Sequence, residues 1–435
     1  MNKLDLAQSG RILRAGNSAV RLAAFAGLLL AAANVRVEAA AARPAPALPP
    51  PTGIIVNVST EPQLQAAVAG LKSNTTIVIA PGTYTLSSTL YFNGTFTNIA
   101  LRGSTGNAAD VVLVGRGMAN ASYGNVPYGV WVGGNVQGIT VANVTIRDLY
   151  YHPIILNAGT QSPHIYNVRL VNAGQQFLKS SPDGSGGGVN NGLVEYAVME
   201  YDTTSRDNYT NGVDVHTGQN WIIRNSLFRN IRAPQGQLAG PAILMWNGSK
   251  NSIVEGNTFI DCQREIALGL IDRIAPHDHS GGVIRNNFIY RSSAIAGDVA
   301  VGIFDSPNTQ VLHNTALLSG SYPNAVEYRF VGTTGAVIVN NLSDSAVQSR
   351  DGAAGTVSGN SKLATPAVFI DALSGDLHLK STASIAIDKV TVNANSPTDW
   401  DGQARPIGTS ADIGADEFSV ANGTLSAPTN LRILQ

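Results

Sequence analysis

The chain has 435 residues and a formal net charge of −1, with charged residues at only 13% of positions, so it lacks the basic surface that nucleic-acid-binding proteins use. Its single cysteine, Cys262, excludes an internal disulfide framework and a cysteine-rich zinc site. The 45 glycines, in a chain that is 44% hydrophobic, are typical of an all-β protein with many corners.

Residues 1–42 predict a bacterial export signal. A basic start is followed by an apolar run at 22–33 and by small residues suited to cleavage at 37–42. The run is shorter than the roughly 20 residues that a membrane-spanning helix needs, so we favour cleavage over retention as an anchor. Residues 43–53 are proline-rich and predict an extended linker. We therefore expect a secreted, periplasmic or surface protein with no membrane span in the mature chain.

The folded part begins near residue 54 with a short helix. Residues 60–71 (TEPQLQAAVAGL) show the spacing of an amphipathic helix, with Thr60 suited to cap its N-terminus. Residues 75–86 (TTIVIAPGTYTL) then predict two strands joined by a Pro-Gly turn. A repeat domain must cover the open end of its first coil, and a helix laid across that end would do so.

One pattern then returns through residues 143–341: an apolar strand, an asparagine or a substitute for it, and a second apolar strand. We align the copies on Asn143, Asn167, Glu195, Asn225, Asn257, Asn287, Asn314 and Asn341. The steps range from 24 residues (143 to 167) to 32 residues (225 to 257), which indicates a solenoid of strands. Stacked coils about 4.8 Å apart would let asparagines at one corner form a hydrogen-bonded ladder.

Each copy also carries a further strand with alternating exposure. These strands are predicted at 153–157, 176–180, 212–216, 242–246, 265–270, 299–304, 325–330 and 346–350. The long connections lie at 181–191, 202–211, 232–241, 271–280 and 319–324. We expect these connections on one side, where they would wall a groove, because insertions in repeats map to one face.

The cap helix, the IVIAPGTY stretch at 77–84 and the coils together resemble the beginning of the pectate-lyase-like right-handed parallel β-helix superfamily. This resemblance implies an all-β, right-handed parallel β-helix (a solenoid) over residues 54–364. Residues 365–418, with DWDGQARP and DIGADEF, resemble the C-terminal closing region of many secreted bacterial β-helix proteins. We interpret residues 419–435 as a tail or as a linker to a further module.

Acidic residues in the closing segment could bind calcium. They are Asp399, Asp401, Asp412, Asp416 and Glu417. A purely structural role is the preferred interpretation, because acidic turns in such segments usually face solvent. No cofactor is required by the sequence, and calcium is the one that we consider, either in the closing segment or at Asp214.

Charged and aromatic residues interrupt the further strands. Coil spacing makes Lys179 and His216 potential neighbours, and Asp214 shares a strand face with His216. The catalytic candidates are Lys179, Asp214, His216 and Arg264. The substrate-binding candidates are Trp246, Glu265, His277, Glu327 and Arg329. The competing interpretation is that these residues form polar ladders on an ordinary exposed sheet.

Cleavage of a uronate polymer by elimination needs a cation for the carboxylate, a base for the C-5 proton and an acid for the leaving oxygen. His216 or Lys179 would be the base. Asp214 would orient His216 or hold calcium, and Arg264 would bind the carboxylate.

The stretch NGVDVHTG (211–218) resembles the Asp-Pro-His-Asp stretch of alginate epimerases at Asp214 and His216, and departs from it at Val215 and Thr217. The motifs of typical pectate lyases and polygalacturonases are not found in the sequence. We therefore predict a monomeric lyase that cleaves an acidic polysaccharide by β-elimination. The alternatives are a uronate C-5 epimerase and a non-catalytic glycan-binding or adhesion protein.

Overall fold

The structure is a computed structural model that describes residues 42–273 and 275–419. The export signal predicted for residues 1–42, except its last residue, lies outside the described residues, as does the tail beyond Ser419. Among the described residues, no helix is long and apolar enough to cross a membrane.

A short helix covers the first coil, as predicted. Helix α1 (Glu61–Ala69) contacts the strands β1 (Ile54–Val58), β2 (Thr75–Ile79) and β4 (Leu90–Gly103), and it buries Leu64 and Val68 against them. The backbone N–H of Gln63 donates to the hydroxyl of Thr60, which confirms the predicted N-cap. The helix thus covers apolar side chains that an uncapped first coil would expose to water.

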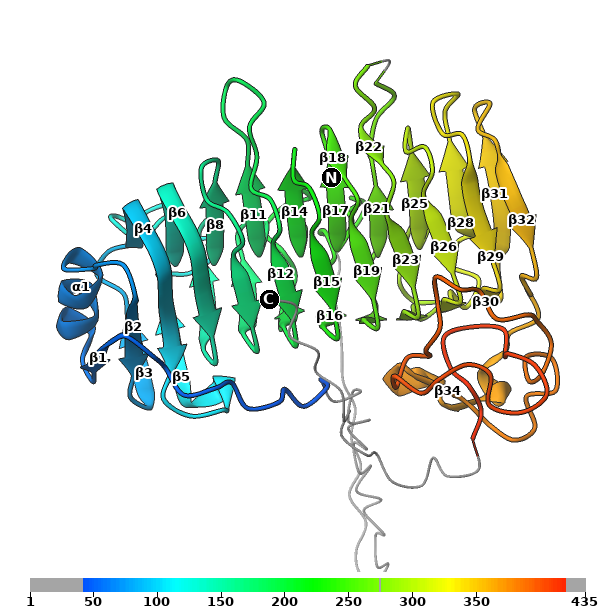
Figure 1. The fold of residues 1–435 in the computed structure, drawn as a ribbon, viewed down its shortest axis with the longest axis horizontal. Helices are drawn as coiled ribbons and strands as arrows, with labels where there is room; N and C mark the ends of the chain where they lie inside the picture. Colours follow the sequence, from blue (N-terminus) through cyan, green and yellow to red (C-terminus); the bar gives the residue numbers. More distant parts are fainter. Residues whose placement is uncertain (1–41, 274, 420–435) are drawn as a thin grey trace, which may run out of the picture. The chain divides into compact units, whose positions relative to one another are not determined.

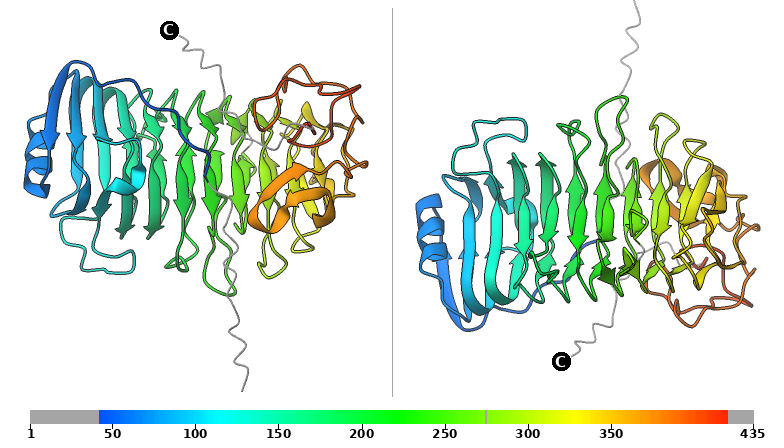
Figure 2. Two further views of the ribbon diagram at one scale, coloured as in Figure 1. Left: turned by 90° about the horizontal axis from the view of Figure 1, so that it is seen from below. Right: turned by 90° about the horizontal axis from the view of Figure 1, so that it is seen from above.

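Three parallel sheets run the length of the β-helix (Figure 1; Figure 2). The first sheet contains β8 (Ile154–Asn157), β11 (Leu178–Ser181), β14 (Val213–His216), β17 (Ile243–Trp246), β21 (Ile266–Leu268), β25 (Val301–Phe304), β28 (Asn324–Arg329) and β31 (Ala346–Arg350). The second contains β1 (Ile54–Val58), β2 (Thr75–Ile79), β9 (His164–Tyr166), β12 (Leu193–Glu195), β15 (Ile222–Arg224), β19 (Ile253–Glu255), β23 (Val283–Arg285), β26 (Gln310–Leu312), β29 (Ala336–Val339) and β32 (Gly355–Ser358).

The third sheet contains β3 (Gly82–Thr85), β5 (Val111–Val114), β7 (Thr145–Leu149), β10 (Arg169–Ala173), β13 (Val198–Glu200), β16 (Leu227–Arg229), β20 (Thr258–Ile260), β24 (Phe288–Tyr290), β27 (Thr315–Leu317) and β30 (Leu342–Ser343). Two long strands, β4 (Leu90–Gly103) and β6 (Val130–Ala142), pass from the first sheet into the second and join them. The short strands β18 (Ser249–Lys250) and β22 (His279–Ser280) form a separate pair.

Each strand pairs in parallel with the equivalent strand of the next coil. In the first sheet, for example, Leu178 lies opposite Val213, and Val213 lies opposite Ile243. Columns of valine, isoleucine and leucine therefore face inward and form a continuous core, whereas the alternate columns face outward. This arrangement confirms the predicted right-handed parallel β-helix.

The corner between the second and third sheets corrects the predicted asparagine alignment. Asn143, Asn167 and Asn225 have φ values of 55°, 46° and 53°, so they occupy the left-handed region that asparagine tolerates. Asn167 Nδ2 donates to Asn143 Oδ1 at 2.9 Å, so the expected ladder contact is present between these two copies. The buried ladder uses the next corner position. Its members are Asn257, Asn287, Asn314, Asn341 and Asn360. Each Nδ2 of the first four donates to the next Oδ1 at 2.8–3.0 Å. The asparagines of the repeat therefore fulfil two different roles.

The segment 365–419 packs beside the β-helix and not across its end. It contains η2 (Pro366–Val368), η3 (Ala372–Ser374) and the antiparallel pair β33 (Phe369–Asp371) and β34 (Asp376–Leu379). The earlier η1 (Ala108–Asp110) belongs to the first coils. The segment shares an apolar cluster with outward-facing residues of the third sheet, such as Phe288 and Leu317. Because it lies laterally (Figure 1), the last strand, β32, is left exposed along its whole length.

The proline-rich residues 43–53 have no regular structure before Ile54, but they do not stand free of the domain. Ala45 and Leu48 pack against a cluster of Ala142, Tyr166 and Tyr196 on the outside of the second sheet. The hydroxyl of Tyr166 donates to the carbonyl oxygen of Pro46. The predicted linker is therefore attached to the side of the β-helix.

Candidate functional site

Three neighbouring strands of the first sheet bring four polar or aromatic side chains together. Lys179 of β11 lies directly opposite Asp214 of β14 in the parallel register. His216, two residues farther along β14, faces outward on the same side and lies opposite Trp246 of β17. The apolar residues between them point into the core, so the strand pattern alone presents the four side chains on one surface.

The side chains are in direct contact. Lys179 Nζ lies 2.6 Å from Asp214 Oδ2 and 2.6 Å from His216 Nε2. Trp246 Nε1 donates to Asp214 Oδ1 at 2.8 Å, and His216 Nε2 lies 3.5 Å from the same oxygen. The imidazole and indole ring centroids are 4.5 Å apart. We call Lys179, Asp214, His216 and Trp246 together the Lys-Asp-His cluster.

Burial and charge define the state of the carboxylate. Asp214 has a side-chain exposure of 3%, whereas Lys179 has 10% and His216 has 16%. Burial alone would raise the pKa of Asp214, but the contact with His216 and the charge of Lys179 outweigh it and lower the pKa. Asp214 is therefore an anion beneath the other side chains, and the imidazole is the most accessible titratable group.

Loops flank the first sheet along both of its edges. This corrects the prediction that all the long connections lie on one side. Segments 202–211 and 232–241 lead from the third sheet into the first. Segments 181–191 and 271–280 lead out of it toward the second sheet. The fully buried Asp278 accepts hydrogen bonds from the N–H groups of Leu270 and Asn247, so it ties the last of these loops to the residue that follows Trp246.

Two of the predicted substrate-binding residues, Glu265 and Glu327, lie inside the protein. Glu265 is fully buried and forms an ion pair at 2.6 Å with Arg291, which is also fully buried. Burial raises the pKa of Glu265 to about 7, although the charge of Arg291 opposes this shift. Glu327 has a side-chain exposure of 2% and pairs with Arg350 at 3.0 Å. These two carboxylates face partners within the fold, which corrects their predicted role in substrate binding.

The remaining predicted residues are partly exposed but lie outside the cluster. Arg264 pairs with Asp298 at 3.0 Å, and Arg329 pairs with Asp351 at 2.6 Å. His277 lies 2.6 Å from Asp305 on the loop that Asp278 ties down. In the described part of the chain, none of these three contacts Lys179, Asp214 or His216, so their predicted roles have no direct support from the structure.

Aromatic residues that the sequence reasoning missed extend from the cluster. Trp131 lies in the same outward column as Lys179, two coils toward the N-terminus, because Trp131 pairs with Ile155 and Ile155 pairs with Lys179. Tyr91 lies opposite Trp131, and the centroids of the two rings are 5.7 Å apart. Tyr91 is 47% exposed. The alternation in Val-Trp-Val (130–132) carried this information, because it places the tryptophan outward between two buried valines.

A third residue that was not identified from the sequence, His152, lies near Lys179 at the N-terminal end of the strands. His152 is buried, stacks on Tyr128 at 5.6 Å, and its Nδ1 lies 3.0 Å from the carbonyl oxygen of Gln176. Burial lowers its pKa to about 4, and the charge of Lys179 contributes in the same direction. His152 is therefore a neutral neighbour of Lys179.

The surroundings of Asp214 do not suit the calcium ion that was considered there. Both carboxylate oxygens already contact Lys179 or Trp246, and a lysine ammonium at 2.6 Å repels a cation. Within residues 42–273 and 275–419, one group of three His, Asp or Glu side chains is close enough to hold a metal ion, and it lies in the closing segment.

Comparisons with known proteins support the fold. No family model and no curated protein matches the chain. Among solved structures, a rhamnogalacturonan lyase is similar with a TM-score of 0.50 and 11% identity, over 77% of this chain and 98% of the other. An alginate lyase from Paenibacillus sp. has a TM-score of 0.47, 16% identity and coverages of 70% and 97%. The pectate lyase Pel9A has a TM-score of 0.44, 17% identity and coverages of 85% and 97%.

Proposed function

We propose that this protein cleaves an acidic polysaccharide by β-elimination at the Lys-Asp-His cluster. The main support is that one ionised carboxylate, one ammonium group and one imidazole are in contact on the outer face of the first sheet. The similar solved structures named as polysaccharide lyases on this fold support the proposal. Export, as residues 1–42 predict, would place the protein where such polymers occur.

The proposed reaction uses each member of the cluster differently. A uronate carboxylate would draw the Lys179 ammonium away from His216 Nε2, because a carboxylate is the stronger acceptor. The freed Nε2 lone pair then takes the C-5 proton. The electron pair left behind forms the C-4–C-5 double bond as the C-4–O bond breaks, and the His216 imidazolium returns its proton to the leaving oxygen.

Charge stabilisation is assigned to Lys179 and Asp214. The ammonium group neutralises the negative charge that builds on the uronate carboxylate when C-5 loses its proton. Asp214 holds that ammonium at 2.6 Å and is itself held by the indole N–H of Trp246 at 2.8 Å. The carboxylate thus positions the catalytic cation and does not need to touch the substrate.

The composition of the cluster argues against hydrolysis. Glycoside hydrolases generally use two carboxyl groups on either side of the scissile bond, about 5–10 Å apart. The one carboxylate of the cluster, Asp214, is 3% exposed and is already held by Lys179 and Trp246, so it is poorly placed to act on a glycosidic bond. Elimination needs only one proton carrier and one cation, and the cluster contains both.

The aromatic pair suggests how a polymer lies on the sheet. Trp131 is two coils from Lys179, or about 10 Å at the usual strand spacing. A chain running along the column would stack sugar rings on Trp131 and Tyr91 while another residue reaches the cluster. We therefore propose that the substrate lies along the β-helix axis and extends toward the N-terminal coils.

The test is a screen of alginate, polygalacturonate, rhamnogalacturonan and glycosaminoglycans for the ultraviolet absorbance of the new double bond. We expect activity on one polymer class, and we expect His216→Ala to lose at least about 100-fold in kcat, in the range that general-base removal produces. His164→Ala is the matched control, because His164 also pairs with an acid, Glu195, at 3.0 Å but lies on the second sheet.

The other outcomes separate the alternatives. Inversion at C-5 without chain cleavage, seen by nuclear magnetic resonance, would identify an epimerase that uses the same proton abstraction. Binding without any chemical change, unaffected by His216→Ala, would support a glycan-binding protein. Either result would overturn the lyase proposal.

A further inference from the structure

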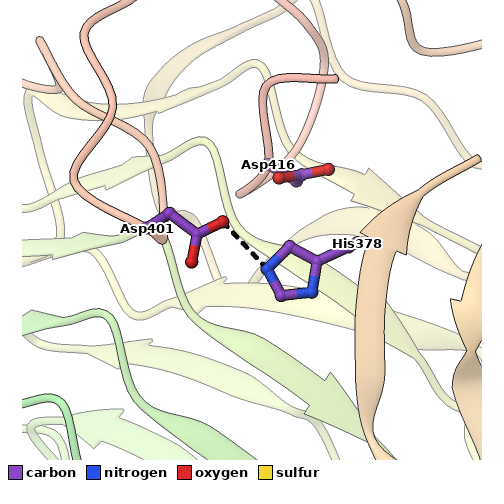
Figure 3. Close-up of side chains that lie close together, drawn as sticks. All are labelled: His378, Asp401 and Asp416. Atoms are coloured by element: carbon purple, nitrogen blue, oxygen red, sulfur yellow. Dashed lines mark hydrogen bonds and ion pairs between the residues drawn. The ribbon is translucent and has the colours of Figure 1, made fainter. Parts of the chain in front are cut away.

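A second cluster of ionisable side chains lies in the closing segment, away from the first sheet. His378 is on β34, Asp401 is in the turn after Trp400, and Asp416 is near the end of the described chain. One potential ligand atom from each of the three lies within 4.8 Å of the other two. Figure 3 shows the three side chains meeting from separate stretches of the segment.

The geometry points to a binding site for one divalent transition-metal ion, with His378, Asp401 and Asp416 as its ligands. In a site of this kind, metal–ligand distances near 2.1 Å place ligand atoms about 3.4 Å apart in a tetrahedral arrangement. His378 Nε2 and Asp401 Oδ2 are already 3.1 Å apart. Only small side-chain movements would bring the Asp416 oxygen to the same centre.

The histidine is oriented as metal-binding histidines usually are. Its other ring nitrogen, Nδ1, lies 2.6 Å from Asp376 Oδ1. A carboxylate in this position fixes the ring and increases the basicity of the nitrogen that faces the metal. Phe288 and Trp400 also contact the ring edge-on, each with centroids 5.0 Å away, so the imidazole has little freedom to turn.

Asp416 provides independent evidence for a missing ligand. The residue is 1% exposed, and its Oδ2 accepts a hydrogen bond from the N–H of Leu379 at 2.7 Å. Its Oδ1 is buried and has no hydrogen-bond partner among the described residues. A buried carboxylate oxygen without a partner is costly, and a coordinated cation would satisfy it.

The neighbouring carboxylates are already occupied. Glu417 pairs with the fully buried Arg405, and Asp412 accepts N–H groups of Asp388 and Phe418. Asp399 accepts N–H groups of Gln403 and Glu417. These contacts remove three of the five acidic residues that the sequence suggested for calcium and leave Asp401 and Asp416.

The ligand set also identifies the class of ion. Calcium and magnesium prefer sites made entirely of oxygen, whereas an imidazole with two carboxylates suits ions such as zinc or manganese. The three ligands come from stretches 15 to 38 residues apart (401 to 416, and 378 to 416). Binding would therefore add a cross-link between three parts of the closing segment that the His378–Asp401 and Leu379–Asp416 contacts already bring together, and it would stabilise the segment against unfolding.

The test is metal binding to the untagged protein, stripped with EDTA and titrated with ZnCl2, MnCl2 or CaCl2 in a calorimeter. We expect one equivalent of zinc or manganese to bind and to raise Tm reversibly, with calcium binding at least 100-fold more weakly. Asp416→Asn is the central variant, because its amide oxygen can still accept from Leu379 and the fold should persist. It should lose the bound ion and the Tm shift.

His378→Gln should likewise lose the ion. His164→Gln is the matched control, because His164 has one carboxylate partner at 3.0 Å and lies outside the cluster. It should bind like the unmodified protein. Equal zinc binding by Asp416→Asn, no binding of zinc or manganese by the unmodified protein, or preferential binding of calcium would each overturn the proposal.

Discussion

The asparagine ladder allows a stability prediction to be worked out atom by atom at Asn287. Its Oδ1 accepts from the backbone N–H and the Nδ2 of Asn257, both at 3.0 Å. Its Nδ2 donates to Asn314 Oδ1 at 2.9 Å and shares its two hydrogens with the carbonyl oxygens of Val254 and Arg285, each at 3.0 Å. Asn287→Ala removes all five contacts in a fully buried position.

The expected cost follows from what remains unpaired. The buried N–H of Asn257 loses this acceptor, which costs about 1–3 kcal/mol, and each other hydrogen engaged in these contacts contributes about 1 kcal/mol. Asn287→Ala should therefore lower the free energy of unfolding by about 4–6 kcal/mol. Asn225→Gly is the contrasting variant, because Asn225 has a φ of 53° and the next coil carries Gly256 at this corner with a φ of 62°. It should cost about 1 kcal/mol or less.

Urea unfolding followed by circular dichroism measures both values, provided that the transition is a single cooperative step with an unchanged m-value. Equal costs for the two variants, or a cost below about 1 kcal/mol for Asn287→Ala, would refute the distinction between ladder asparagines and corner asparagines.

Three further predictions concern the ion pairs and the aromatic column. Asp214→Asn should lower the free energy of unfolding by about 3 kcal/mol at pH 7, because it leaves a buried ammonium unpaired. Because the pKa of Asp214 is lowered in the folded state, this difference should be fully present above pH ~4 and should shrink as pH falls further, as urea titrations at several pH values would show. Arg291→Met should cost about 3–5 kcal/mol in the same assay, because it leaves Glu265 buried without its counter-charge. Trp131→Ala should raise KM on the active polymer several-fold with kcat nearly unchanged, and an unchanged KM would exclude stacking on the aromatic pair.

The periodic parts of the fold could be predicted from the sequence. Strand β14, expected at 212–216, is found at Val213–His216, and its alternation placed Asp214 and His216 on the outside. A strand spacing of about 4.8 Å was then enough to bring Lys179 next to them. Strand period and coil stacking together thus predicted the core of the candidate site, although not its hydrogen bonds.

The irregular parts were not open to prediction in the same way. Glu265 follows the strand pattern but is fully buried, because Arg291 reaches it from the corner after the third sheet. The meeting of His378, Asp401 and Asp416 depends on turns with no period. The closing segment packs laterally because outward apolar residues such as Phe288 and Leu317 need cover, and that need is visible only once the third sheet is formed.

Elimination at His216 can be tested directly by cleavage of the active polymer in water enriched in heavy oxygen. Elimination forms a double bond without adding water, so mass spectrometry immediately after cleavage, before the new reducing end exchanges its oxygen with the solvent, should show unlabelled products from the unmodified protein and no products from His216→Ala. One labelled oxygen per cleavage would show hydrolysis and would contradict the account, as would undiminished cleavage by His216→Ala.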